Sequence, residues 1–258
     1  MILPGEERGS GAPAVVLLHA GVADRRMWAG LLESLAEEGA RVFAPDFAGF
    51  GEAELPPVPS APWEDVLDTL DAHGIDRFVL VGNSFGALVA KRVSLLAPER
   101  VSGLFLISPP PEGDVEPSPQ LRAAWDAEED ALEREDVEAA VEAVVDAWTL
   151  PAADDAQREL VATMQRRAFE LGLATEGVID SVRDPLEEDP GAFARVAPRT
   201  VLAFGEHDMP DFRDAAEALA SELPDARVEE IAGAGHLAPI ERPEAVLALL
   251  RGLLALPT

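Results

Sequence analysis

Hydrophobic residues follow two alternating patterns over the first hundred positions of this chain. Short continuous apolar runs have the length of strands that are buried on both faces of a parallel sheet. These runs cover residues 14–18, 41–44, 78–82 and 101–107. Between them, apolar residues at every third or fourth position predict helices. The predicted helices cover residues 27–38, 63–73 and 87–97. Strands that alternate with helices indicate βαβ units and therefore a parallel sheet.

The pattern changes after Ser108, where five prolines between residues 109 and 119 predict a loop. From about residue 120 to 194 only the helical period is present. The alternation then resumes, with strands at 200–204 and 227–231 and helices at 210–222 and 241–254. The sequence therefore predicts an α/β fold: a doubly wound, mostly parallel sheet with an inserted all-helical cap. We assign residues 1–109 and 196–258 to the core and residues 110–195 to the cap.

Ser84 is the candidate nucleophile. It lies in the segment Gly82-Asn83-Ser84-Phe85-Gly86, between a predicted strand and a predicted helix. A G-x-S-x-G segment in this context is typical of a nucleophile elbow. A serine on such a sharp turn has strained backbone angles, so the residues two positions to either side must be small. The N-terminus of the following helix favours negative charge that develops at the site.

A nucleophilic serine needs a base and an acid that orients the base. Asp208 follows the predicted strand at 200–204, and His236 follows the strand at 227–231. In an open parallel sheet, functional groups collect at the carboxyl ends of the strands. The order serine, acid, histidine along the chain differs from that of the two common serine-protease folds. The sequence therefore predicts a catalytic triad of Ser84, Asp208 and His236.

The charge of the chain limits its partners. There are 49 acidic and 20 basic residues, for a net charge of −29, so nucleic acid and anionic membrane surfaces are not expected to bind. Residues 110–195 hold 23 acidic and 7 basic residues, which is more than half of the excess of acidic over basic residues in the whole chain. We interpret them as a solvated outer face of the helices. Genome composition and solubility explain the acidity better than adaptation to salt.

Several classes of site and location are excluded or disfavoured. The chain has no cysteine, which excludes disulfides, cysteine-based zinc sites and a cysteine nucleophile. The four histidines lack the spacing of metal ligands, so we expect no metal and no cofactor. No apolar stretch approaches the roughly 18–20 residues of a membrane-spanning helix, and the first residues do not resemble a signal peptide. We therefore expect no membrane insertion and a cytoplasmic location.

The chain resembles the α/β-hydrolase superfamily, in the branch of serine esterases and lactonases with a helical cap. The resemblance extends over nearly the whole chain and is weakest in the cap. Besides Gly82 to Gly86, it rests on Leu17-Leu18-His19-Ala20-Gly21 with Trp28, Pro45-Asp46-Phe47-Ala48-Gly49-Phe50-Gly51, Gly205-Glu206-His207-Asp208, and Gly233-Ala234-Gly235-His236 followed by Glu241-Arg242-Pro243.

The resemblance implies a role for each residue of the predicted site. Ser84 would attack an acyl carbonyl, His236 would relay the proton, and Asp208 would orient His236. The oxyanion hole would consist of the backbone N–H groups of Phe85 and Gly21, with Val22 as the alternative to Gly21.

Three departures from the family pattern affect these expectations. The family usually has His-Gly where this chain has His19-Ala20, which leaves the second oxyanion donor open between Gly21 and Val22. Ala48 and Ala53 stand where arginine and serine are usual. Only thirteen residues precede Ala14, whereas the family commonly has two strands there, so we expect the first strand to be missing or vestigial.

Other polar and aromatic residues are expected to serve the structure. We predict that His19 stabilises its loop, that His207 is exposed, and that His73 lies at a helix end without a function. Glu112 and Asp114 follow a strand end and are weaker candidates than Asp208 for the acid. The large side chains of the cap are expected mainly in its core, with one or two at the pocket. They are Trp125, Trp148, Met164 and Phe169.

The reaction type follows from the serine. Epoxide hydrolases and haloalkane dehalogenases of this superfamily need a carboxylate at the position of Ser84, so the resemblance excludes both. Hydrolysis through a covalent acyl-enzyme remains. We expect a carboxylic ester or lactone hydrolase that acts on a small, neutral substrate.

Two alternative functions are those of hydrolases that degrade aromatic compounds. The Asn83-Ser84 elbow resembles that of hydrolases that split carbon–carbon bonds, but these usually have tryptophan where this chain has Leu237. Met27-Trp28 and the Gly-His ending resemble enol-lactonases. Both groups act on anions, which fit poorly with an acidic cap. A third alternative, of another class, is a triad-bearing small-molecule receptor or signalling protein, which would turn its ligand over slowly. The sequence leaves a homodimer open.

Overall fold

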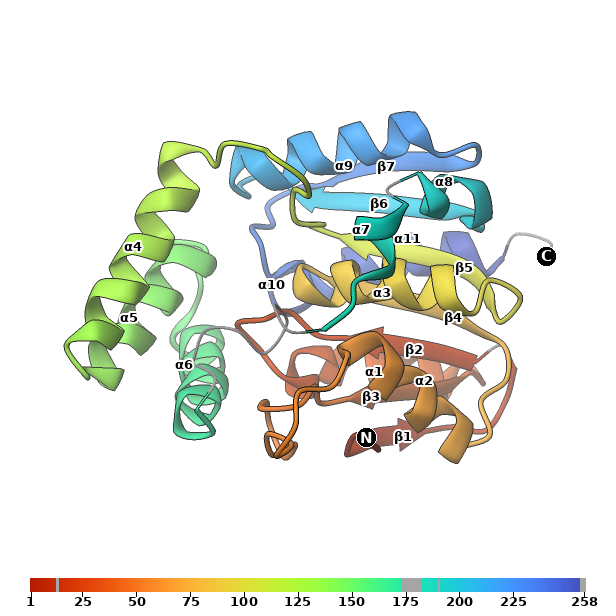
Figure 1. Cartoon of the computed structure of the whole chain (residues 1–258), viewed down its shortest axis with the longest axis horizontal. Helices are drawn as coiled ribbons and strands as arrows, with labels where there is room; N and C mark the ends of the chain where they lie inside the picture. Colours follow the sequence, from red (N-terminus) through yellow and green to blue (C-terminus); the bar gives the residue numbers. More distant parts are fainter. Residues whose placement is uncertain (13, 173–181, 190, 256–258) are drawn as a thin grey trace.

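A computed structural model of the chain describes residues 1–12, 14–172, 182–189 and 191–255. Within them, seven strands form one sheet in the spatial order β1-β3-β2-β4-β5-β6-β7 (Figure 1). The strands are β1 (Gly5–Arg8), β2 (Ala14–Leu18), β3 (Arg41–Pro45), β4 (Phe78–Asn83), β5 (Val101–Ile107), β6 (Thr200–Gly205) and β7 (Ala226–Ile231). β1 is antiparallel to β3, and all other neighbouring pairs are parallel. The predicted α/β fold with a mostly parallel sheet is confirmed.

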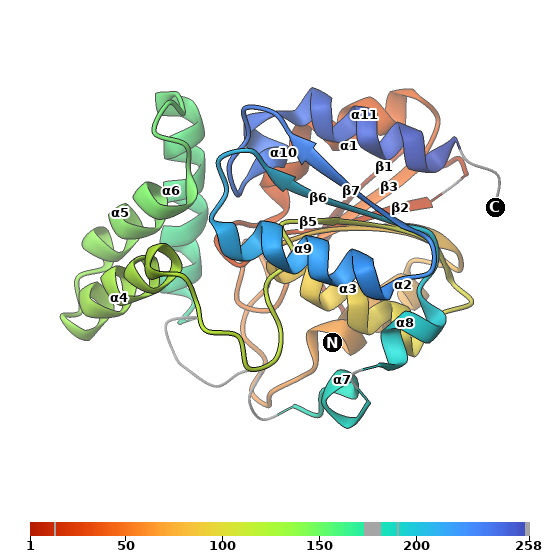
Figure 2. The same ribbon diagram turned by 90° about the horizontal axis from the view of Figure 1, so that it is seen from above.

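Helices cover both faces of the sheet, as Figure 2 shows. One face is covered by α1 (Ala29–Glu37) and α11 (Pro243–Leu254), and the other by α2 (Pro62–Ala72), α3 (Phe85–Leu96) and α9 (Pro210–Glu222). Two further short elements precede α1 and α11. They are the 3-10 helix η1 (Arg25–Trp28), before α1, and α10 (Ala238–Glu241), before α11. The helix predicted over 27–38 includes the end of η1, and the helix predicted over 241–254 begins at the last residue of α10.

The alternation of side chains along the central strands produces two apolar cores. Val79 and Val81 of β4 pack with α1 and α11, whereas Phe78 and Leu80 pack with α2 and α3. Successive side chains of a strand point to opposite faces of the sheet, and β2 and β5 follow the same alternation. All four of these β4 side chains are at most 5% exposed. The continuous apolar runs in the sequence therefore correspond to strands that are buried on both faces.

Three helices between β5 and β6 lie beyond the carboxyl ends of the strands (Figure 1). They are α4 (Pro119–Glu133), α5 (Val137–Trp148) and α6 (Asp155–Glu170), and we call them the three-helix insertion. The helical period that the sequence shows from about residue 120 is interrupted after α4. Glu135 has a positive φ of 56°, and the Asp136 side chain caps α5 by accepting the N–H of Ala139.

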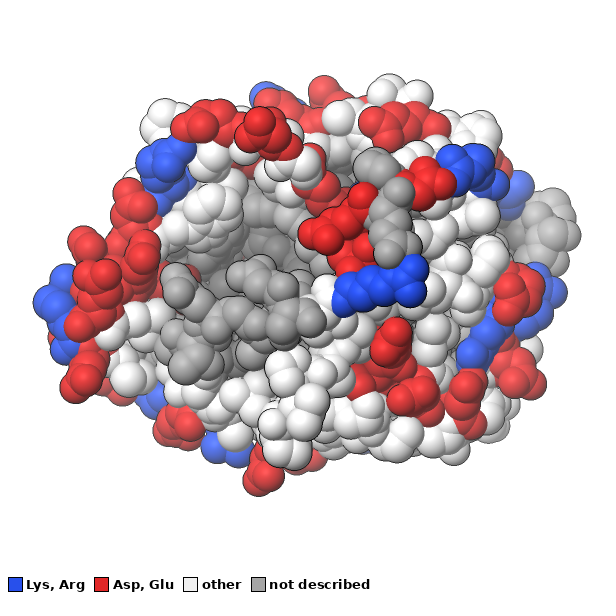
Figure 3. All heavy atoms as spheres, in the orientation of Figure 1, with Lys and Arg blue, Asp and Glu red and all other residues white. Residues whose placement is uncertain are grey.

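The exposed face of α4 is strongly acidic. Asp126, Glu129, Asp130 and Glu133 are all exposed there, and Figure 3 shows acidic side chains along this edge of the molecule. Such an arrangement is expected of a solvated helix face.

The predicted cap, residues 110–195, includes more than the three-helix insertion. α7 (Pro185–Glu188) and α8 (Ala192–Val196) also fall within it, yet both lie against α3 (Figure 1). Phe193 of α8 is 2% exposed and belongs to the core on the α3 face of the sheet. Residues 173–181 and 190 of the predicted cap lie outside the described residues. The cap boundaries stay a prediction.

The N-terminal part of the sheet is short, as expected. In residues 1–12 the structure has one strand, the four-residue β1, where the family commonly has two strands before β2.

The turn between β4 and α3 packs tightly against the end of β2. A Cβ on Gly86 would overlap the carbonyl oxygen of Leu18 and lie 2.7 Å from that of His19. A Cβ on Gly82 would overlap the carbonyl of Gly86 in the same way. Both glycines are therefore required by the close approach of three backbone segments.

We predict that Gly86→Ala lowers the free energy of unfolding by ~3 kcal/mol, because two backbone carbonyls would have to move. Gly30→Ala is the matched control, since Gly30 is also the second residue of its helix and its Cβ would only reach Pro243 at 3.8 Å. Gly30→Ala should be neutral or stabilise by up to about 1 kcal/mol. Urea unfolding of both variants tests the prediction, and equal effects would contradict it.

Candidate active site

Ser84 has the backbone strain expected of a nucleophile elbow. Its φ and ψ angles are 53° and −116°, and it is the N-cap residue of α3, so the helix N-terminus faces the site. Its N–H donates to the carbonyl of Ile107 at the end of β5 at 2.9 Å. Within the described residues the Ser84 hydroxyl makes no hydrogen bond. Hydrogen bonds of catalytic groups often form only when substrate is bound.

Asp208 and His236 form a buried pair at the same edge of the sheet. His236 Nδ1 lies 3.0 Å from Asp208 Oδ1 and 3.3 Å from Oδ2, and the two side chains are 3% and 1% exposed. Asp208 Oδ1 also accepts the N–H of Met209 at 2.8 Å. Because an ionised carboxylate only accepts hydrogen bonds, Nδ1 carries the proton in this pair. The Nε2 atom of a neutral His236 is then free to accept a proton.

Asn83 links the serine turn to the histidine loop. Its Nδ2 donates to the backbone carbonyl of His236 and to that of Ile107, both at 3.2 Å. Asn83 is completely buried and is the only asparagine in the chain. Although Asn83 and His236 are 153 positions apart, one side chain thus fixes the residue next to Ser84 relative to the histidine backbone.

The predicted oxyanion donors lie close together. A Cβ on Gly21 would be 3.5 Å from the Cβ of Phe85, so the loop after β2 passes beside the first residue of α3. Within the described residues, no hydrogen bond from the backbone N–H groups of Phe85, Gly21 or Val22 is seen. These groups can therefore donate to a ligand, and the choice between Gly21 and Val22 stays open.

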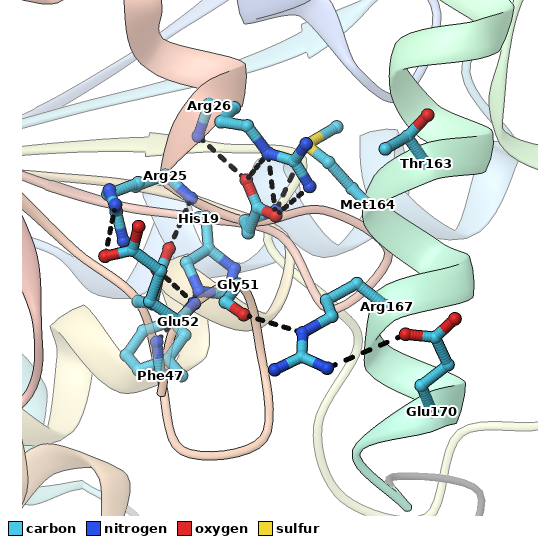
Figure 4. A network of polar contacts seen from close by, with 12 residues as sticks. His19, Arg25, Arg26, Phe47, Gly51, Glu52, Thr163, Met164, Arg167 and Glu170 are labelled. Atoms are coloured by element: carbon cyan, nitrogen blue, oxygen red, sulfur yellow. Dashed lines mark hydrogen bonds and ion pairs between the residues drawn. The ribbon is translucent and has the colours of Figure 1, made fainter. Parts of the chain in front are cut away.

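His19 holds the loop that contains Gly21. It is completely buried, and its Nε2 accepts the N–H of Phe47 at 2.9 Å (Figure 4). Its Nδ1 donates to the carbonyl of Ala20 at 2.8 Å. Burial lowers the pKa of His19, which favours the neutral ring that these two bonds require. His19 is thus a structural link between the loops after β2 and β3, as the sequence predicts.

The remaining polar candidates lie outside this site. The His207 side chain is 54% exposed, and His73 lies at the C-terminal end of α2 with its Nδ1 3.0 Å from Glu7 Oε2. Glu112 pairs with Lys91 and Arg92. Of the acids that the sequence offers, Asp208 is the one that contacts His236.

Two aromatic rings contact the imidazole of His236. The centroid of the Trp148 ring, at the end of α5, lies 4.6 Å from that of His236, and the Phe212 centroid lies 4.2 Å from it. Both rings belong to an apolar cluster between the three-helix insertion and the loops after β2 and β6. Its buried members are Leu121, Ala124, Val144, Trp148, Met209 and Phe212, and Val22, Ala147 and Phe169 pack against it. Trp125, by contrast, is 48% exposed.

A polar network joins α6 to the core loops (Figure 4). The Arg167 guanidinium donates to the carbonyl of Gly51 at 3.2 Å, and the sulfur of Met164 accepts the N–H of Asp24 at 3.4 Å. Asp24 in turn holds Arg26 at 2.6 Å. A cavity of about 410 Å³ lies between these groups. The network attaches the three-helix insertion to the loops that follow β2 and β3.

The described residues contain neither a cluster of metal ligands nor a membrane-spanning helix. No group of three or more histidines and carboxylates in residues 1–12, 14–172, 182–189 and 191–255 is placed to hold a metal ion. In the same part of the chain, no helix combines the length and apolarity needed to cross a membrane.

Comparison with known proteins identifies the family. The model of the alpha/beta hydrolase family matches residues 15–249. In structure, the chain is similar to a thermophilic esterase from Thermogutta terrifontis, with a TM-score of 0.80 and 26% identity over 98% of this chain and 92% of the esterase. The chain therefore belongs to the alpha/beta hydrolase family and is a hydrolase.

Curated relatives match only part of the chain. Epoxide hydrolase 2 from Siraitia grosvenorii is 39% identical over 105 residues, which are 39% of this chain and 33% of that protein. The 2-hydroxymuconate semialdehyde hydrolase of Pseudomonas putida is 36% identical over 105 residues, 39% of this chain and 37% of that protein. The matched segments span about a third of these relatives, so their activities do not define the reaction of this chain.

Three residues at this site have a position that the sequence analysis did not predict. Trp148 was expected mainly in the cap core, Asn83 served only as a point of resemblance, and Glu241 served only as part of a motif. Glu241 is buried and accepts the N–H of Gly235, next to His236, at 2.6 Å. The sequence does show that Asn83 directly precedes Ser84 and that Glu241 lies five residues after His236. Sequence position alone, however, does not show which groups these two side chains contact.

We predict that Asn83→Ala destabilises the fold by ~1–3 kcal/mol, because it leaves the buried carbonyl of His236 without its side-chain donor, whereas the carbonyl of Ile107 keeps the N–H of Ser84. Asn83→Asp should cost more, although it preserves the shape, because it places a carboxylate against both carbonyl oxygens. Thermal unfolding and hydrogen exchange at residues 234–238 measure the two effects. An aspartate variant as stable as wild type would show that the two hydrogen bonds do not stabilise the histidine loop.

Proposed function

We propose that this protein is a serine hydrolase that cleaves a carboxylic ester or lactone through an acyl-enzyme. The observation that supports it most is the buried Asp208–His236 pair, which Asn83 connects to the strained turn of Ser84. In this proposal Ser84 is the nucleophile, His236 the general base and Asp208 the residue that orients it.

The proposed reaction has two steps. Ser84 Oγ attacks the acyl carbon while its proton moves to His236 Nε2, and the N–H groups of Phe85 and of Gly21 or Val22 stabilise the oxyanion. The C–O bond to the leaving group then breaks, and Nε2 returns the proton to the departing oxygen. A water molecule hydrolyses the acyl-enzyme by the same route and releases the acid and free Ser84.

The surroundings of His236 favour a neutral, largely apolar substrate. Trp148, Phe212 and Leu121 form part of an apolar cluster that reaches the imidazole ring. An apolar group of the substrate gains free energy on leaving water for such a surface, whereas an anionic group would lose hydration there.

A carbon–carbon bond hydrolase is the second candidate. The partial match to the Pseudomonas putida hydrolase and the Asn83-Ser84 elbow favour it. Epoxide hydrolysis is the reaction named for another partial relative, but in this superfamily it needs a carboxylate at the position of Ser84. A receptor of this fold would differ from both in its slow turnover.

We predict that the purified protein hydrolyses short p-nitrophenyl esters and that Ser84→Ala lowers kcat by about 10⁴-fold or more, because the nucleophile is lost. Asp208→Asn should lower it by about 10³–10⁴-fold, because the histidine tautomer is no longer fixed. Ser221→Ala on the exposed face of α9 is the control and should leave kcat unchanged.

The panel of substrates should contain esters of increasing acyl length, neutral and anionic lactones, an epoxide and a vinylogous 1,5-diketone acid. Turnover of the diketone acid above that of every ester would favour the carbon–carbon hydrolase. Ester turnover that survives Ser84→Ala would exclude the proposed nucleophile.

A further inference from the structure

Two sets of contacts connect the three-helix insertion to His236 and its loop. The first set consists of aromatic rings. Trp148 and Phe212 both lie against the imidazole, with tilted interplanar angles of 49° and 53°. Phe212 belongs to α9 of the core, whereas Trp148 is the last residue of α5. Trp148 and Phe212 also contact each other, with centroids 5.9 Å apart. The three rings therefore contact one another, and His236 packs against one ring of the core and one ring of the insertion.

The second set is formed by a buried carboxylate. Glu241 is 6% exposed, and its Oε2 accepts the N–H of Gly235 at 2.6 Å while its Oε1 accepts the N–H of Leu150 at 3.2 Å. Gly235 is adjacent to His236, and Leu150 lies two residues beyond Trp148. A Cβ on Gly235 would lie 3.1 Å from the Leu150 side chain, so this side chain also packs against Gly235.

These contacts come from one short stretch of the insertion, residues 148–150. Burial raises the pKa of Glu241, and the N–H groups of Gly235 and Leu150 act in the opposite direction by stabilising its charged form. A further bond, from Gln157 Nε2 to the carbonyl of Ile240 at 3.1 Å, holds the first turn of α6 against α10.

We propose that Trp148, together with Glu241, is a positioning residue for His236, so that the three-helix insertion forms part of the catalytic machinery and does more than bind substrate. The inference rests on the proposed function, because it concerns the proton transfers of His236. Trp148 limits rotation of the imidazole about its bond to Cβ, and Glu241 fixes the backbone that bears it.

The contacts of Trp148 and Glu241 should affect the reaction rate, because both help to position His236. His236 must direct Nε2 first at the Ser84 hydroxyl and then at the leaving oxygen, and a small misplacement of a reacting group lowers the rate strongly. When Nε2 takes the proton, the ring becomes a cation within 5 Å of two aromatic rings. A cation beside aromatic rings in a buried site is stabilised by their electron density.

The test compares kcat and KM of Trp148 variants on p-nitrophenyl acetate, butyrate and octanoate. Trp148→Leu, which keeps an apolar side chain, should lower kcat by about 10- to 100-fold by the same factor on all three esters. Trp148→Phe retains a ring and should recover kcat to within about 3-fold of wild type. Trp125→Leu, the same change at an exposed position of α4, should leave kcat within about 2-fold of wild type.

If Trp148→Leu folds poorly, Glu241→Gln tests independently whether the positioning of His236 affects kcat. The amide keeps the volume but turns a donor toward one of the two N–H groups, so kcat should fall about 10-fold with KM little changed. The double variant should lose less than the product of the two single losses, because both residues act through His236. Glu244→Gln, on the exposed face of α11, is its control.

Three outcomes would overturn the inference. A kcat of Trp148→Leu within 2-fold of wild type would do so, as would a loss that grows with acyl length, which would make Trp148 only a wall for the acyl chain. Failure of Trp148→Phe to recover kcat would show that bulk and not an aromatic ring is needed. Activity that persists in Ser84→Ala would instead remove the proposed function itself, so the two failures are distinguishable.

Discussion

The turn at Ser84 packs so closely against the ends of β2 and β5 that its backbone has almost no freedom. Gly86 meets the carbonyls of Leu18 and His19, and the N–H of Ser84 is bound to Ile107. This packing holds the serine at a positive φ and directs the N-terminus of α3 toward the same point. It also brings Gly21 beside Phe85, so the proposed nucleophile and the proposed oxyanion donors depend on one contact.

His236 is positioned by groups from four parts of the chain. Asp208 binds its Nδ1, Asn83 binds its carbonyl, Glu241 binds the preceding N–H, and Trp148 with Phe212 contacts its ring. Asn83 is the last residue of β4, and Asp208 lies in the turn that follows β6. Trp148 belongs to the insertion, which itself is attached to the core by the network around Arg167 and Asp24 (Figure 4). In the proposed mechanism, the position of the insertion therefore bears on the chemistry as well as on substrate choice.

The sequence predicts those features that depend on strand ends. Parallel strands place their carboxyl ends at one edge, so the positions of Ser84, Asp208 and His236 after apolar runs were enough to predict that they lie at one edge of the sheet. The contact of Trp148 with His236 could not be predicted, because it depends on how α5 is oriented relative to the sheet. The break at Glu135 was missed for a local reason. The apolar period continues through α4 and α5, and the two helices are separated by only three residues, in which Glu135 has a positive φ and Asp136 caps α5. The catalytic roles, the cap boundaries and the substrate remain predictions.

The central claim is that Ser84 is the nucleophile of an acyl-enzyme, and covalent labelling measures this most directly. The protein should be treated with a fluorophosphonate, digested with trypsin and analysed by mass spectrometry. We expect one label per chain, on the peptide 78–91 between Arg77 and Lys91, at Ser84, and no label in Ser84→Ala. A fully active protein that takes up no label, or that takes it up at another residue with loss of activity, would contradict the account.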